Sequence, residues 1–522
     1  MAHHEIERTY TPPPQAPVPD LTELPGVAQV GPPVVTDLEA AYVDTPDLRL
    51  VRAGISLRRR TGGTDAGWHL KLPVGEGRDE LRRPLTTGTT PPQQLRTLVA
   101  ARVGEEPLVV VANVLTRRTT QELLDADGAV LAELVDDEVT GSPGPGLAGE
   151  TSPGAVTVWR EWELELVTAG TDLLEAADEH LAELGVEVAA VSRKIEVVLG
   201  EALARAATAP GRPGRGKPAG RLVELRLQQQ VEELLRRETE IRRGGARGVH
   251  QARVACRRIR SALATYRPLL DREVTEPVRE ELRWLAGELG GARDAEVVHD
   301  LLRQRVVDLP AEQVVGPVRI RLHSTYGASR RADVVAVLDS PRCRALWPVL
   351  QELAACPPLA EGAELPARKV AVPRVDRDVA RVEKAVERVV DGLDRLARSD
   401  DDPAGVEVRR EVEEAWHDAR KAAKRLRYAA EVLEPAWGKR ARRLTRTAKA
   451  ITQRLGERQD TEITRRHLLD LARAATAAGE SAFTYGVLHA REQARAEELE
   501  TAFLDAWPRT RSRLRKQARA LA

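Results

Sequence analysis

The chain opens with a stretch, HEIERTY, in which two glutamates alternate. In an extended strand the side chains of Glu5 and Glu7 point to one face, and Thr9 is the next residue on that face. Carboxylates placed side by side repel each other unless a cation joins them. The stretch WREWELELV repeats the alternation from Glu161 to Glu165. The spacing therefore predicts two acidic strand faces that need a cation beside them.

Basic residues fall in phase on other predicted strands. Arg58 and Arg60 face together in ISLRRRT, and Lys71 takes the equivalent face in WHLKLP. Glu133 and Asp137 share a face in AELVDDEV. One such pair is typical of a solvated face, but five strands in phase, with apolar residues mostly opposite, favour a charged interior. Burying charges of both signs is costly unless a charged ligand and a metal compensate them.

The types of these residues indicate a particular chemistry. Carboxylates, with few histidines and no clustered cysteines, select hard divalent cations such as Mg²⁺ or Mn²⁺. Arginines and a lysine that face the same interior suit phosphate oxygens. The combination predicts metal-assisted phosphoryl hydrolysis, in which the metal neutralises charge and orients a water.

The elements that carry these residues lie in the first 200 positions. Short alternating runs are separated by the turn signals TGG, DADG and SPGPG. Two helical stretches, PPQQLRTLVAARV and LLEAADEHLAELG, interrupt them. About eight antiparallel strands are expected, arranged as a sandwich or as a closed barrel.

The rest of the chain has a different composition and a repeat. Residues 1–204 form the predicted β domain, and a linker rich in Gly, Pro and Arg covers residues 205–220. Residues 221–522 are Leu-, Ala-, Glu- and Arg-rich with helical spacing. HQARVACRRIR followed by LGGARDAEV matches HDARKAAKRLRY followed by LGERQDTEI. These matches predict a duplicated helical bundle with repeats at about 221–355 and 374–522.

Each repeat carries a basic stripe on one helix. Spacings of three, four and three place the histidine and the three following basic residues on one narrow face. Two such helices related by pseudo-two-fold symmetry would line one basic groove, although ordinary surface charge is the alternative in an arginine-rich bundle. The cluster KRARRLTRTAK either widens this surface or is simply solvated. The stripe residues are His250, Arg253, Arg257 and Arg260, with His417, Arg420, Lys424 and Arg427.

Charge is divided unequally along the 522 residues. Residues 1–200 carry 17 Lys and Arg against 32 Asp and Glu, a net of −15, and the remainder carries 63 against 48, a net of +15. A basic half implies a polyanionic partner. Aromatic residues make up only 3%, which leaves little for base stacking and argues against nucleic acid as a partner. Three cysteines, no long apolar run and no secretory signal predict a cytoplasmic protein that does not enter a membrane.

The first half resembles the CYTH domain, the triphosphate tunnel metalloenzyme family. EIERT resembles the ExExK signature, and YVDTPDLRLVRAGISLRRR, GWHLKLP, REWELEL and SRK also fit. The resemblance implies an eight-stranded antiparallel tunnel that hydrolyses triphosphates, with Glu133 and Asp137 positioning water or a second metal and Lys71 assisting. It implies metal ligation by Glu5, Glu7, Glu163 and Glu165. It implies phosphate binding by Arg58, Arg60, Lys71, Lys194 and either Arg117 or Arg118, between which the alternation does not decide.

The main departure from this family is Thr9, which stands where the signature has lysine. A charged hydrogen bond is worth roughly 1.5–3 kcal/mol. Its loss corresponds to roughly ten- to a hundredfold lower efficiency if the lysine acts in the transition state. Arg8 and Arg193 are the neighbouring cations that could supply the charge missing at Thr9.

The second half resembles the CHAD domain, the conserved-histidine α-helical domain. This resemblance implies an all-α domain that binds inorganic polyphosphate along a basic cavity. Gln459 stands where the first repeat has Arg293, and Asp294 and Asp460 are read as partners of neighbouring cations.

The predicted fold class is therefore α+β, with an eight-stranded antiparallel β tunnel and flanking helices before an all-α duplicated bundle. The predicted function is hydrolysis of triphosphate with Mg²⁺ or Mn²⁺, combined with polyphosphate binding. The alternative is a weak or inactive polyphosphate-binding protein that targets or organises polyphosphate granules. Intact carboxylates argue against this alternative, because a pure anion binder gains nothing from them.

Overall fold

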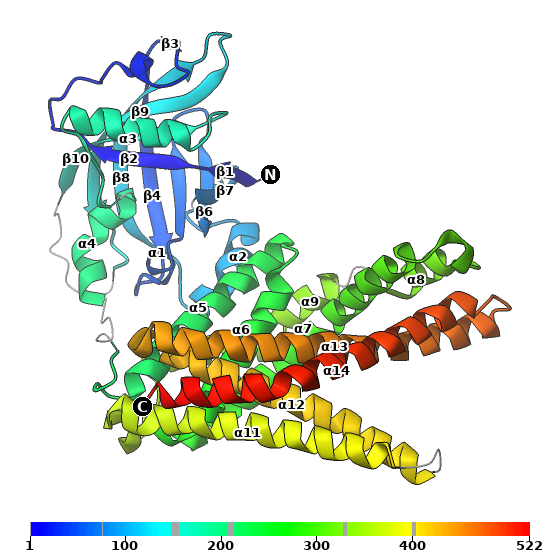
Figure 1. The fold of residues 1–522 in the computed structure, drawn as a ribbon. Helices are drawn as coiled ribbons and strands as arrows, with labels where there is room; N and C mark the ends of the chain where they lie inside the picture. The colour runs from blue at the N-terminus through cyan, green and yellow to red at the C-terminus, as the bar shows by residue number, and fades with distance from the viewer. Residues whose placement is uncertain are drawn as a thin grey trace. The chain divides into compact units, whose positions relative to one another are not determined.

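The chain folds as two compact units, Met1–Ala209 and Pro210–Ala522. Figure 1 shows the first unit as a curved sheet with helices and the second as a set of helices. Side chains of residues 291–297 are not described, so Arg293 and Asp294 lie outside the described side chains. The computed structural model describes residues 2–75, 77–147, 156–191, 193–206, 213–326, 331–398 and 403–522.

The first unit is built on one antiparallel sheet, which has eleven strands among the described residues. The expected eight strands become eleven because Ile6 interrupts the first one and two strands of two residues each, β3 and β11, are added. The strands are β1 (Ala2–Glu5), β2 (Glu7–Thr11), β3 (Gln29–Val30), β4 (Val34–Asp44), β5 (Ser56–Thr61), β6 (Gly67–Val74), β7 (Gly77–Arg83), β8 (Val109–Leu124), β9 (Val130–Pro143), β10 (Thr157–Leu166) and β11 (Glu187–Val188).

The N-terminal segment closes this sheet. The strand order is β1-β7-β6-β5-β4-β8-β9-β10-β2-β11. Strand β1 pairs with β7, where Glu5 lies opposite Arg78, and β2 pairs with β10, where Glu7 lies opposite Glu165. Because β1 and β2 are separated by Ile6 alone, one continuous segment joins strands from the two sides of the sheet. The predicted antiparallel tunnel is confirmed, and the sandwich is excluded.

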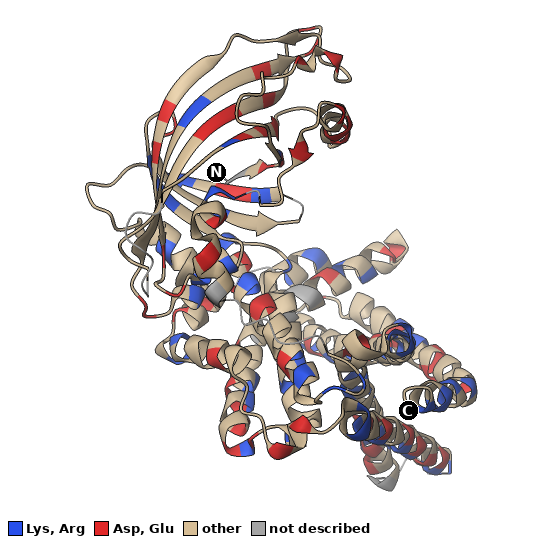
Figure 2. Cartoon of the chain, turned by 90° about the vertical axis from the view of Figure 1, so that its left-hand side faces the viewer, with Lys and Arg blue, Asp and Glu red and all other residues tan. Residues whose placement is uncertain are grey.

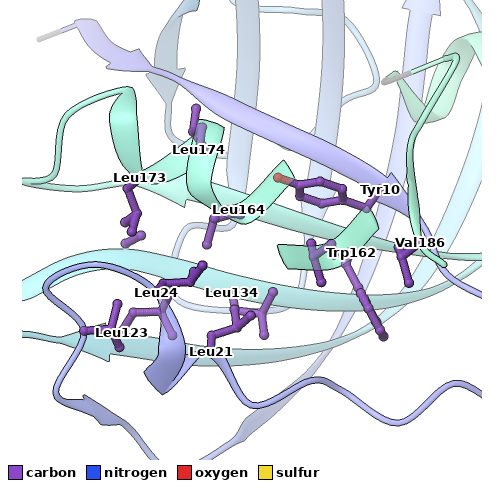
Figure 3. Packing of buried hydrophobic residues seen from close by; sticks show 14 residues of the cluster. Tyr10, Leu21, Leu24, Leu123, Leu134, Trp162, Leu164, Leu173, Leu174 and Val186 are labelled. Carbon is purple, nitrogen blue, oxygen red and sulfur yellow. The ribbon is translucent and has the colours of Figure 1, made fainter. Parts of the chain in front are cut away.

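Helices cover the sheet of the first unit. These are α1 (Arg49–Arg52), α2 (Gln93–Val103), α3 (Asp172–Glu183) and α4 (Lys194–Ala206). On the outer face Tyr10, Leu134 and Trp162 are buried in one cluster with Leu174 of α3 (Figure 3). Helix α4 packs Ile195 and Leu199 against the strand residues Val114 and Val139. Alternation thus sends the apolar side chains of β10 outward and its glutamates inward.

The second unit is helical among its described residues, as predicted. Its helix α6 buries Ala252, Cys256, Ile259 and Leu263, the apolar stripe beside the basic one. No helix in the described ranges combines the length and apolarity that a membrane span requires. The helices are α5 (Gly220–Arg243), α6 (Gly248–Thr265), α7 (Arg272–Val307), α8 (Val318–Tyr326), α9 (Arg331–Leu338), α10 (Pro341–Ala355), α11 (Ala367–Leu396), α12 (Pro403–Trp437), α13 (Lys439–Ala477) and α14 (Phe483–Arg519).

Candidate functional site

The sheet of the first unit surrounds a cavity of about 630 Å³. Ten of the twelve tunnel residues selected from the sequence line it, and Arg117 and Asp137 do not. Figure 2 shows acidic and basic residues distributed along the strands of the curved sheet. The ten are Glu5, Glu7, Arg58, Arg60, Lys71, Arg118, Glu133, Glu163, Glu165 and Lys194.

Acidic residues of the cavity gather on three adjacent strands. Glu165 of β10 lies opposite Glu7 of β2 on one side and opposite Glu133 of β9 on the other. Burial and the neighbouring Glu5 raise the pKa of Glu165 to about 7, although Lys71 opposes the shift. A row of carboxylates that repel each other in this way is poised to accept a cation.

A second acidic group is partly neutralised by two cations. Arg118 bonds both oxygens of Asp137, at 2.9 and 2.6 Å, and one oxygen of Glu163 at 2.9 Å. The Nζ atom of Lys194 lies 2.7 Å from Glu163 and 2.9 Å from Asp137, and it also contacts Glu161. Burial raises the pKa of Glu163, but Lys194 and Arg118 outweigh it and lower the pKa overall.

Both acidic groups offer the oxygen ligands that hard divalent cations prefer. Among the described residues, Asp137, Glu161 and Glu163 form the group whose carboxylate oxygens all lie within 4.8 Å of one another. Lys194 touches all three, so a metal there would compete with its ammonium. In the row through Glu165, Arg78 pairs with Glu7 and Lys71 acts electrostatically on Glu165. The residues present therefore fit a divalent metal, as the alternating glutamates predicted.

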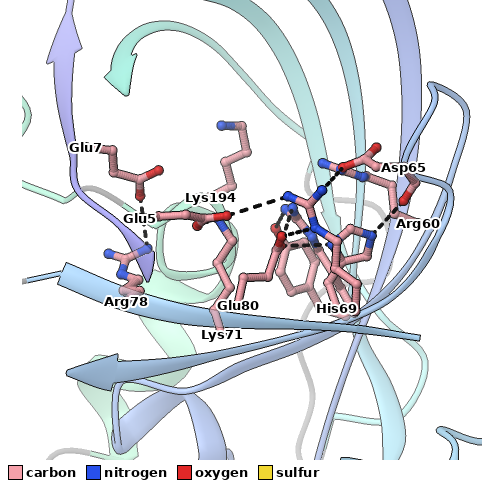
Figure 4. A network of polar contacts seen from close by, with 12 residues as sticks. Glu5, Glu7, Arg60, Asp65, His69, Lys71, Arg78, Glu80 and Lys194 are labelled. Atoms are coloured by element: carbon pink, nitrogen blue, oxygen red, sulfur yellow. Dashed lines mark hydrogen bonds and ion pairs between the residues drawn. The ribbon is translucent and has the colours of Figure 1, made fainter. Parts of the chain in front are cut away.

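Basic residues gather on β5, β6 and β7, adjacent strands of the sheet. Lys71 Nζ lies 2.5 Å from Glu5, and Arg78 lies 3.3 Å from Glu7 (Figure 4). Arg58 donates to the hydroxyl of Tyr42 at 3.2 Å. These contacts hold long cationic side chains at the cavity, where they can meet phosphate oxygens.

Sequence reasoning missed part of this network. Arg78, Glu80 and Arg82 alternate on β7 in GRDELRR, so the same period-two test would have found them. Glu80 accepts from the buried His69 at 2.8 Å. Asp65, which pairs with Arg60, lies in a turn whose sequence carries no comparable signal.

The structure decides between Arg117 and Arg118. Arg118 faces the cavity, whereas Arg117 lies on the opposite side of β8, where its cross-strand neighbours are Asp37 and Glu138. We therefore remove Arg117 from the candidate phosphate ligands. Asp137 also lies outside the cavity lining, because it is fully buried and bound by Arg118 and Lys194. Its oxygens belong to the group that could hold a metal ion, and its role in positioning water or a second metal stays a prediction.

Thr9, which stands where the family signature has lysine, lies beside a proposed metal ligand. It is opposite Glu163 in the β2–β10 pairing, is buried, and its hydroxyl has no hydrogen-bond partner within the described chain. Arg8 cannot replace the lysine, because it points away and pairs with Asp178 at 2.6 Å. The cation nearest Glu163 from outside the sheet is Lys194, at the first position of α4. The family resemblance implied only phosphate binding by Lys194, whereas here its ammonium contacts three carboxylates.

In the helical unit the two basic stripes meet. Arg253 and Arg257 of α6 act electrostatically on Lys424 of α12, as does Arg420 on the same helix. Burial, followed by Arg420 and Arg257, lowers the pKa of Lys424 to about 8. Asp460 favours the charged form and is the nearby carboxylate. The structure thus brings four of the eight stripe residues into one cationic cluster.

The other stripe residues have separate surroundings. His250 and His417 are exposed, and His417 contacts Gln459 at 3.0 Å. Arg260 is close enough to Arg283 and Arg279 for their charges to lower its pKa, although burial contributes most. Arg427 pairs with Glu431 at 3.0 Å, one turn further along α12.

The fold and the tunnel define a known class of protein. The CYTH domain model matches residues 3–193 and the CHAD domain model matches residues 225–469. The chain belongs to the family that joins these two domains, and its first unit is a triphosphate-tunnel domain. CYTH members are often triphosphatases or cyclases, and they depend on metal.

Two relatives span almost the whole chain. The proteins MT2285 and Rv2226 from two strains of Mycobacterium tuberculosis are each 37% identical over 511 residues, which is 95% of this chain and 94% of each relative. PptA from Streptomyces chartreusis is 23% identical with a TM-score of 0.43, over 56% of this chain and 99% of its own. The CHAD domain from the plant Ricinus communis is 23% identical with a TM-score of 0.41, over 60% and 98%. These two TM-scores are too low to support an inference about function.

Proposed function

We propose that the tunnel hydrolyses inorganic triphosphate, or a related triphosphate, with Mg²⁺ or Mn²⁺. The observation that supports this proposal is the opposition of acidic β2, β9 and β10 to basic β5, β6 and β7 around one cavity. A bound triphosphate needs both sides, because metal ligands and phosphate ligands carry opposite charge.

The residues have distinct proposed roles. Glu5, Glu7, Glu163 and Glu165 would hold the metal, which when bound neutralises phosphate charge and lowers the pKa of a water. Arg58, Arg60, Arg118 and Lys71 would grip phosphate oxygens, with Lys194 beside Glu163. Glu133 faces the cavity, forms no ion pair with any residue that the structure describes, and would accept a proton from the attacking water.

Phosphate release from tripolyphosphate tests this activity. Turnover is expected with Mg²⁺ or Mn²⁺ and is expected to stop with a chelator. Release that persists in the chelator would contradict the metal-dependent reaction. Complete absence of turnover, with polyphosphate still bound, would favour the second candidate, a polyphosphate-binding protein whose tunnel is inactive, which the uncharged Thr9 supports.

Metal binding is expected to depend on pH through Glu165. Its pKa of about 7 means that a proton must leave before the carboxylate can bind metal. Below pH 7 the affinity for Mn²⁺ should fall by up to about tenfold per pH unit, and above pH 8 it should level off. Calorimetric titration at pH 6, 7 and 8 measures this. The Glu165→Gln variant should bind Mn²⁺ more weakly, and its affinity should not change with pH in this way. An equal change of affinity with pH in both proteins would contradict the role of Glu165.

We also propose that the helical unit binds inorganic polyphosphate at the cluster of Arg253, Arg257, Arg420 and Lys424. We propose polyphosphate granules as a physiological partner of such a surface. The supporting observation is that cations of α6 and α12 lie close enough to lower the pKa of Lys424. Such mutual repulsion is relieved by a bound polyanion.

Polyphosphate binding should weaken at alkaline pH. Lys424 has a pKa of about 8 in the free protein, and phosphate favours its charged form. Above pH 8 binding must therefore take up a proton, which costs up to about tenfold in affinity between pH 8 and 9. Titration with polyphosphate at pH 7.5 and 9 measures this loss. Lys424→Arg keeps its charge and should lose most of the dependence, and an unchanged dependence would exclude Lys424 as its source.

A further inference from the structure

A cationic cavity lies within the helical unit, apart from the proposed polyphosphate cluster. It has a volume of about 480 Å³ and is walled by α5, α6, α12 and α13. Among the described residues that line it, five are cationic and two are carboxylates, which gives a net charge of +3. The cationic residues are Arg226, Arg258, Arg427, Arg442 and Lys449, and the carboxylates are Glu431 and Glu434.

One carboxylate holds three of these arginines. Glu431 of α12 pairs with Arg226 of α5, with Arg258 of α6 at 3.0 Å and with Arg427 at 3.0 Å. Glu431 and the neighbouring Glu434 together carry less charge than the three guanidinium groups, so positive charge remains. The contacts nevertheless fix three planar donors from three helices around one point, which lowers the entropy cost of binding an anion there.

A buried donor in this group lacks an acceptor. Arg226 is 9% exposed, and its Nε has no hydrogen-bond partner in the described part of the chain. Leaving such a donor unsatisfied is costly in a folded protein. A ligand rich in oxygen atoms would supply such an acceptor.

Two more cations reach the cavity from α13. Arg442 and Lys449 are seven residues apart, which is about two helical turns, so they share one face. Neither forms an ion pair with any residue that the structure describes. Both come from the cluster KRARRLTRTAK, whose Arg443 and Arg446 are exposed, as Arg442 and Lys449 are, but lie outside the cavity lining.

We propose that this cavity binds a compact phosphate anion, either free pyrophosphate or the terminal phosphates of a polyphosphate chain. Arginine forks match phosphate oxygens in pairs. No aromatic residue is among the described lining residues, so a nucleobase would find no stacking partner. Binding of free pyrophosphate is independent of the proposed polyphosphate function, whereas binding of a chain end rests on it.

Calorimetric titration of the full chain with pyrophosphate in the presence of a chelator tests the site. Arg442→Ala/Lys449→Ala should lower the affinity by about tenfold or more, because two charged contacts are lost. Arg443→Ala/Arg446→Ala removes the same charge from the same helix and should change it less than about twofold. The tunnel is the same in every protein, so its contribution cancels. Equal effects in the two double variants, or no saturable binding by the unmodified chain, would overturn the proposal.

A third variant separates this site from the proposed polyphosphate cluster. Arg257→Ala/Lys424→Ala should weaken long-chain polyphosphate while pyrophosphate binding is retained. If it lowers pyrophosphate affinity as much as Arg442→Ala/Lys449→Ala does, the cavity is no separate site and the proposal fails. If it leaves polyphosphate unaffected, the proposed function of the cluster fails while the cavity stands. Competition with long-chain polyphosphate distinguishes the two sources. If the cavity binds chain ends, long-chain polyphosphate should displace bound pyrophosphate. If the cavity binds only free pyrophosphate, it should not.

Discussion

Replacing Glu5 and Glu7 together by glutamine is expected to lower metal-dependent phosphate release from tripolyphosphate by about a hundredfold or more. Changes to residues around metal ligands already cost about 10- to 100-fold, and loss of two ligands should cost at least as much. Glutamine keeps the shape of glutamate and removes its charge, so the pairing of β1 with β7 and of β2 with β10 is retained. Initial rates with Mg²⁺ and Mn²⁺ measure the loss.

The matched control is Glu175→Gln/Glu179→Gln on α3. Both residues are exposed on a helix that covers the outer face of the sheet, and the change in net charge is the same. This control should keep nearly the full rate. Turnover by Glu5→Gln/Glu7→Gln within about twofold of the unmodified chain would exclude these glutamates as metal ligands.

The second large effect is expected from Lys194→Met, which should destabilise the β unit by about 3–5 kcal/mol without metal. Removing one partner of a buried ion pair costs about that much. Lys194 is 9% exposed and Asp137 is fully buried, so water replaces little of the lost interaction. Hydrogen–deuterium exchange of peptides from β9 and β10 measures the loss of local stability.

Two conditions should restore the stability of this variant. A divalent metal can take the place of the ammonium among Asp137, Glu161 and Glu163, whose oxygens lie within 4.8 Å of one another. Lower pH should also help, because carboxyl groups with a raised folded pKa stabilise at low pH and lose that contribution as pH rises through it. The Lys194→Arg variant keeps the positive charge, so it should be stable without added metal and without lowering the pH. Protection in Lys194→Met equal to that of the unmodified chain would contradict the expected role.

The class of fold and the face of most tunnel residues followed from the sequence. A strand has a period of two, so the alternation of Glu5 with Glu7 and of Arg58 with Arg60 is a local property that needs no tertiary contact. Helical spacing likewise defined the basic stripe of α6. The repeated histidine motifs indicated a duplicated bundle, because a repeat can be read directly from the sequence without any tertiary contact.

Other features depended on contacts between distant residues. Alternation could not choose between the adjacent Arg117 and Arg118, because it gives relative phase and not which face is inward. The place of Lys194 among three carboxylates requires α4 to pack against the sheet, and no spacing in the sequence encodes that. Arg226 and Glu431 are separated by 205 positions and meet only in the folded bundle. Short-range periodicity thus determined which side chains share a face, and the tertiary structure determined which charges meet, because electrostatic contacts depend on distance in space.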